Sequence, residues 1–137
     1  PSNKNKDFKR IRVRMLLNEL QKEGLDKNKL LLTLNNLKDS DQSIKFYVDK
    51  NIIQNSKFLK KKNTFILNSN FFEQSHEVIF RSLSQLIKTT SKKYYAARGK
   101  SVNELISKIK SNSIKKATLG GCFIEKINET VLIYKEH

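Results

Sequence analysis

Three arginines occupy alternating positions near the start of the chain, at Arg10, Arg12 and Arg14. The chain contains 23 lysines but only five arginines, so this stretch holds most of its guanidinium groups. A guanidinium is a rigid, planar fork that suits phosphates and carboxylates. On a helix, Arg10 and Arg14 would lie one turn apart and Arg12 roughly opposite. The arginines therefore either reach an anionic substrate or pair with acidic neighbours, and their spacing leaves both interpretations open.

A second cationic stretch interleaves four cations with two aromatic residues and is expected to be a connector. Rings in such a segment can stack on bases or riboses while the cations bind phosphates. Alternatively, the tyrosines fill the core and the lysines form an ordinary surface. The candidate RNA-binding residues are Lys92, Lys93, Tyr94, Tyr95, Arg98 and Lys100, together with Lys115 and Lys116 ahead of a Gly120-Gly121 bend.

The net charge is +15, which makes a polyanion the natural partner, with nucleic acid first. The chain is also rich in Asn and Ile, so part of the lysine excess can reflect an A/T-rich genome. It has one cysteine, so no disulfide forms within it, and its two histidines predict no zinc site. The absence of a signal peptide or long apolar run predicts a cytoplasmic protein without a membrane span. The first residue is Pro, so we expect a piece of a longer chain.

The sequence is poor in catalytic machinery. It has no Gly-rich phosphate loop and no Ser or Cys with a credible His base. His76 lies between Glu73 and Glu77 on a predicted helix, where a solvated or capping role is expected. Cys122 lies in a predicted strand and is expected to be a buried small hydrophobe. We therefore expect this segment to have no activity alone.

The apolar pattern predicts an α+β fold, with an N-terminal part of three helices followed by a small mixed layer of short strands and two helices. Residues 1–6 are expected to form a loop, with Asp7 capping the first helix and Gly24 ending it. Apolar residues on two arcs of that helix indicate that it lies between two bodies. The predicted helices span about 8–23, 26–37, 41–54, 71–90 and 102–109, with a break at 38–41, a cap at 68–70 and a Ser101/Glu104 capping box.

The strand signals are short and alternate with turn residues. Phe58-Leu59 and Phe65-Ile66-Leu67 flank a turn with three lysines and predict a hairpin. Further strands are expected at 117–119, 122–124 and 131–134, with a turn at Asn128-Glu129. We expect three domains, at 1–25, 26–56 and 57–137.

Both ends of the chain resemble one family. Pro1-Ser2-Asn3 followed by Phe8-x-Arg10-x-Arg12-x-Arg14 is similar to the segment that closes the catalytic domain of tRNA(Ile)-lysidine synthetases. The later segments resemble the C-terminal part of the short, alphaproteobacterial-type members. These segments are Arg98-Gly99-Lys100 to Leu105, Thr118-Leu119-Gly120-Gly121-Cys122 and Lys135-Glu136.

The resemblance implies an ATP-dependent ligase. Such an enzyme adenylates the first anticodon cytidine of tRNA(Ile) with anticodon CAU, and the amine of free lysine then displaces AMP to give lysidine. ATP and magnesium would be bound by an N-terminal domain with a Ser-Gly-Gly-x-Asp-Ser loop, outside this chain. Arg10, Arg12 and Arg14 would face the cleft, and residues 57–137 would bind the tRNA. A homodimer is left open.

Two other functions remain open from the sequence. The chain could be a stand-alone RNA- or ribosome-binding module without catalytic activity, or a basic helical adaptor for an acidic protein.

Overall fold

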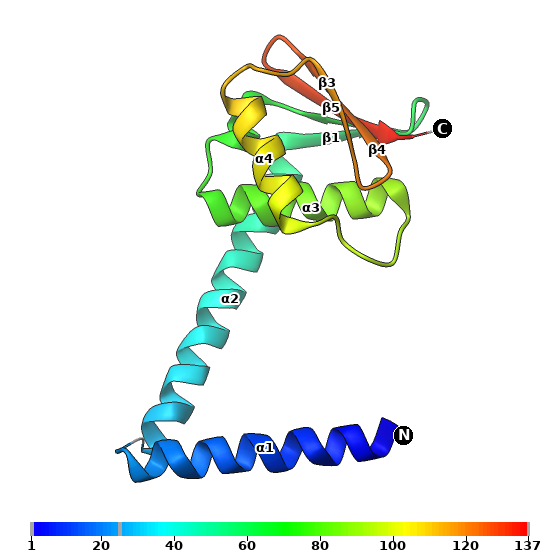
Figure 1. The fold of residues 1–137 in the computed structure, drawn as a ribbon. Helices are drawn as coiled ribbons and strands as arrows, with labels where there is room; N and C mark the ends of the chain where they lie inside the picture. The colour runs from blue at the N-terminus through cyan, green and yellow to red at the C-terminus, as the bar shows by residue number, and fades with distance from the viewer. Residues whose placement is uncertain (1, 25, 137) are drawn as a thin grey trace. The chain divides into compact units, whose positions relative to one another are not determined.

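A computed structural model describes the backbone of residues 2–24 and 26–136 and the side chains of residues 8–24 and 26–136. Pro1, which the sequence places in a loop, and His137, one of the two histidines, lie outside the described residues. The chain divides into two compact units, Pro1–Gln42 and Ser43–His137. Helices and a five-stranded antiparallel sheet together confirm the α+β fold (Figure 1). The predicted boundaries at 25 and 56 remain predictions.

The first unit consists of helix α1 (Ser2–Lys22) and the first part of helix α2 (Lys27–Asn55). Asp26 starts α2 as predicted, because its Oδ1 accepts a hydrogen bond from the Asn28 backbone N at 2.9 Å. The predicted loop at 1–6 and the Asp7 cap are wrong, since α1 already begins at Ser2. Asp7 therefore lies within a helix.

The predicted helix break at 38–41 is also wrong, because α2 runs through it without interruption. Lys38-Asp39-Ser40-Asp41 contains neither Gly nor Pro. Asp and Ser in a helix interior cost only about 0.5 kcal/mol each, which the flanking helical residues readily offset. Two long helices therefore replace the three that the sequence predicts in this part of the chain.

The second unit contains one sheet with strand order β1-β2-β5-β4-β3. The predicted first hairpin is confirmed as β1 (Ser56–Leu59) and β2 (Thr64–Leu67). The last three strands are β3 (Lys116–Leu119), β4 (Cys122–Ile127) and β5 (Thr130–Lys135). Strand β2 pairs with β5, with Thr64 opposite Tyr134 and Leu67 opposite Val131. This long-range pairing joins the first hairpin to the end of the chain.

Two helices, α3 (His76–Ser91) and α4 (Gly99–Lys110), supply the helical side of the core. Both have an apolar stripe at helical spacing, as a helix on a sheet requires. Their buried residues pack against Leu67, Val131, Ile133, Cys122 and Ile124 from the sheet. These five alternate with partly exposed residues along their strands, so the helices cover one face of the sheet (Figure 1).

Two predicted helix starts differ from the structure. The predicted helix at 71–90 is a 3-10 helix, η1 (Ser69–Phe72), followed by α3 from His76. Asn68 caps η1 by accepting a hydrogen bond from the Phe71 backbone N at 3.2 Å. Helix α4 begins at Gly99 with Arg98 at the N-cap, so Ser101 lies within it and the predicted capping box does not form.

The side chain of buried Asn51 forms hydrogen bonds that connect the end of α2 to the rest of the second unit. Its Nδ2 lies 3.3 Å from the Phe71 carbonyl and 3.2 Å from the Ser82 hydroxyl, while its Oδ1 accepts from Asn55 at 2.8 Å. A buried amide needs such partners, because an unsatisfied one would be costly.

Candidate nucleic-acid interface

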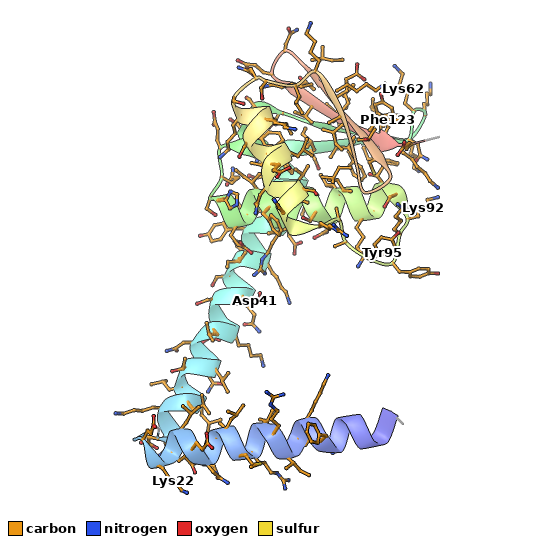
Figure 2. All side chains as sticks on the ribbon, in the orientation of Figure 1. Lys22, Asp41, Lys62, Lys92, Tyr95 and Phe123 are labelled. Atoms are coloured by element: carbon orange, nitrogen blue, oxygen red, sulfur yellow. The ribbon has the colours of Figure 1, made fainter. Side chains whose placement is uncertain are left out.

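Lysines from separate segments gather at one end of the sheet. Lys60, Lys61 and Lys62 lie between Leu59 and Thr64, whose pairing closes the β1–β2 hairpin. Thr64 is opposite Tyr134, and Lys135 is opposite Cys122 at the β3–β4 turn. Both turns and Lys135 therefore share one sheet end, where β2 and β4, the inner strands of the two hairpins, are about 10 Å apart across β5. We call this end, with Lys60, Lys61, Lys62, Lys92, Lys93 and Lys135, the basic end; Figure 2 labels Lys62 and Lys92 on the same side.

The connector between α3 and α4 packs closely against two glycines at this end of the sheet. Gly120 and Gly121 have φ of +58° and +84°, which suits a tight turn between β3 and β4. A Cβ on Gly121 would lie 2.9 Å from Lys93 Cε, and one on Gly120 would lie 3.2 Å from Ala97 Cβ. The connector therefore lies directly on the turn, which brings Lys93 next to Gly121.

The connector tyrosines are exposed. Tyr94 is 99% exposed and Tyr95 is 68% exposed, so the interpretation that they fill the core is wrong. Lys93 Nζ lies 5.7 Å from the centre of the Tyr95 ring, within the range of a cation–π interaction. Exposed tyrosine rings lose contact with water when a flat ligand stacks on them, so their position suits the binding of bases or riboses.

The remaining predicted RNA-binding residues are all exposed but lie on different elements. Arg98 is the N-cap of α4 and Lys100 is in its first turn. Lys115 precedes β3, and Lys116 is the first residue of that strand. Lys92, Lys93, Tyr94 and Tyr95 thus lie in the connector, Arg98 and Lys100 at the start of α4, and Lys116 on the sheet. Sequence reasoning missed Lys60, Lys61, Lys62 and Lys135 as site residues, although the three-lysine turn was visible.

The second unit carries most of the positive charge. Residues 43–137 contain 18 lysines and arginines against seven acidic residues, a net charge of +11. A phosphate approaching the basic end therefore meets a positive field as well as individual ammonium groups.

Cys122 and His76 behave as the sequence predicts. Cys122 is buried, and its Sγ donates to the Ile87 carbonyl at 3.3 Å. Burial raises the pKa of the thiol to about 11, with Lys93 acting in the opposite direction. His76 is exposed, and its Nε2 lies 2.9 Å from Asn103 Oδ1. Within the described part of the chain, no group of three or more His, Cys, Asp or Glu residues could hold a metal ion.

Arg10, Arg12 and Arg14 are exposed on α1. Arg14 borders a hollow of about 360 Å³ where α1 meets the start of α2, lined also by Leu17, Leu30 and Leu31. The aliphatic part of Arg14 can pack there while its guanidinium stays in water. Whether the arginines bind an anion stays a prediction.

We found no match between this chain and any family model, curated protein or solved structure. No helix among the described residues is long and apolar enough to cross a membrane.

Proposed function

We propose that the Ser43–His137 unit binds RNA through the basic end and the α3–α4 connector. The observation that carries this proposal is the convergence of lysines from the β1–β2 turn, the connector and β5 beside two exposed tyrosines. Lysine side chains bind phosphates regardless of sequence, and binding them releases counterions from the nucleic acid. The exposed tyrosine rings between the cations can stack on bases or riboses. A surface that only contacts water has no use for such rings.

We further propose that this RNA is tRNA(Ile) with anticodon CAU and that the chain is part of a tRNA(Ile)-lysidine synthetase. The support is the likeness of both ends of the sequence to that family. In this proposal the protein is cytoplasmic, and ATP, magnesium and free lysine bind in a catalytic domain outside residues 1–137. Arg10, Arg12 and Arg14 would then stabilise charge on the reacting phosphates from one wall of the cleft.

The exposed apolar side chains of the first unit support the proposal that another domain packs against it. Apolar side chains remain exposed along both of its helices: Phe8, Ile11, Val13, Met15, Leu16 and Leu20 on α1, and Leu31, Leu32, Leu34 and Leu37 on α2. So many apolar side chains on two helices are unusual for a free surface. They agree with the expectation that α1 lies between two bodies.

The alternative is a stand-alone RNA-binding module without catalysis. It is favoured by the location of the basic end and both exposed tyrosines within a single compact unit. The two candidates differ in what precedes residue 1: only the synthetase requires an upstream Ser-Gly-Gly-x-Asp-Ser loop after a strand. Its absence from the gene would leave the RNA-binding module alone.

RNA binding is tested by measuring the salt dependence of tRNA affinity. We expect replacement of Lys62, Lys92 and Lys93 by Gln to weaken binding and to reduce the slope of log K against log salt by about 2, since each lost phosphate contact removes about 0.7–0.9. The control variant replaces Lys50, Lys108 and Lys110, which are exposed in the same unit but outside the basic end. Equal losses in both variants would show that only net charge matters.

A further inference from the structure

The sheet has a second face that no helix of the second unit covers within the described residues. Residues paired across strands share a face, and the register gives two rows on this face that cross all five strands. One row is Leu59, Thr64, Tyr134, Phe123 and Thr118; the other is Lys57, Ile66, Leu132, Glu125 and Lys116. We call these two rows the open face. Its members alternate with the core residues that α3 and α4 cover.

Two aromatic rings lie side by side at the centre of the open face. Phe123 is directly opposite Tyr134, with ring centres 5.5 Å apart and planes inclined by 37°. Both are only partly buried. Lys116 Nζ lies 4.5 Å from the Phe123 ring centre and 5.9 Å from that of Tyr134. The Tyr134 hydroxyl donates to Glu125 Oε2 at 3.0 Å, which fixes the ring on the sheet.

We propose that the open face binds an unpaired RNA nucleotide, whose base stacks on Phe123 and Tyr134 while its phosphates reach Lys116 and the basic end. This inference rests on the proposed RNA-binding function and deepens it, because it names unpaired nucleotides as the ligand. A base in a double helix is stacked on both sides and cannot lie on a protein ring, whereas a base in a loop or a single-stranded end can.

The position of the rings relative to the lysines supports an RNA ligand. Tyr134 is opposite Thr64, which follows the three-lysine turn. The next residue in its strand, Lys135, lies at the same end of the sheet but is opposite Cys122, on the face that the helices cover. The aromatic row is therefore the row of the open face nearest to the basic end. An apolar protein partner would gain little from these surrounding lysines, whereas a nucleotide carries both a flat apolar surface and a negative charge.

Lys116 must move for a base to stack on Phe123. Its side chain is exposed and begins at the edge strand β3, so it can leave the ring without disturbing the sheet. A cation–π contact in water is weaker than base stacking on an aromatic ring. The released ammonium group is then available to the phosphate of the stacked nucleotide.

The test compares a 10-nucleotide single-stranded RNA with a blunt 16-base-pair RNA duplex, binding the full chain at fixed salt. We expect Phe123→Leu to weaken single-strand binding about tenfold and to leave duplex binding unchanged, because a leucine retains bulk but cannot stack. Phe46→Leu is the matched control, since Phe46 is exposed but lies on α2. Thermal unfolding checks that each variant is folded.

A second pair of variants keeps the test decisive if Phe123→Leu is unstable. Tyr134→Phe keeps a ring and should retain single-strand binding, whereas Tyr134→Leu should lose it about tenfold. Unchanged single-strand binding by the folded leucine variants would overturn the inference while leaving the proposed RNA-binding function intact. If the unmodified chain bound neither RNA, the proposed function itself would fail.

Discussion

Gly120 and Gly121 offer the sharpest test of how the connector is fixed to the sheet. Both have positive φ, so an alanine at either position is strained by about 1 kcal/mol. The neighbours of the added methyl group differ. At Gly120 a Cβ would lie 2.9 Å from Ile87 Cγ2, inside the core, whereas at Gly121 it would meet the flexible end of Lys93 at 2.9 Å.

These contacts predict unequal losses of stability. Overpacking a core costs about 1–3 kcal/mol, so Gly120→Ala should lower the free energy of unfolding by about 2–4 kcal/mol in total. Lys93 is exposed and can move aside, so Gly121→Ala should cost only about 1 kcal/mol. Gly121→Ala should instead weaken RNA binding, because it displaces an ammonium group of the basic end.

Urea unfolding followed by tyrosine fluorescence measures the difference. All four tyrosines lie in residues 43–137 and none in the first unit, so this signal reports the unit that contains the turn. The comparison requires similar m-values for both variants. Equal destabilisation by the two alanines, or a greater loss at Gly121, would refute the claim that Gly120 is in contact with the core.

Two further predictions follow from Cys122 and from the arginines. Because the pKa of the Cys122 thiol is raised to about 11 in the folded state, the stability it contributes is complete below pH 9 and is lost as the pH rises towards 11. Cys122→Ala should reduce this loss in alkaline urea unfolding, and an identical pH profile would contradict it. In a synthetase containing this chain, Arg12→Ala or Arg14→Ala should lower lysine incorporation much more than tRNA binding, with Lys9→Ala as control. Equal losses in both assays would make these arginines phosphate contacts only.

Local features of the fold were predictable because they depend on neighbouring residues. The lysine turn between two short apolar runs identified the β1–β2 hairpin, and Gly120-Gly121 identified the β3–β4 turn. Helix boundaries were less predictable. Ser101 and Glu104 matched a capping box, yet α4 begins at Gly99, which lies against the Phe80 ring of α3.

By itself, the sequence determined the charge, the α+β class and the cationic connector with its two tyrosines. Only the tertiary structure decided where these features meet. The pairing of β2 with β5 brings residues 64–67 next to residues 131–134, so the lysine turn and Lys135 share one end of the sheet. The contacts of Lys93 and Ala97 with Gly121 and Gly120 bring the connector to the same end. The same register puts Phe123 beside Tyr134 on the uncovered side of the sheet. Strand alternation alone cannot identify that side, because the helices determine which face becomes the core.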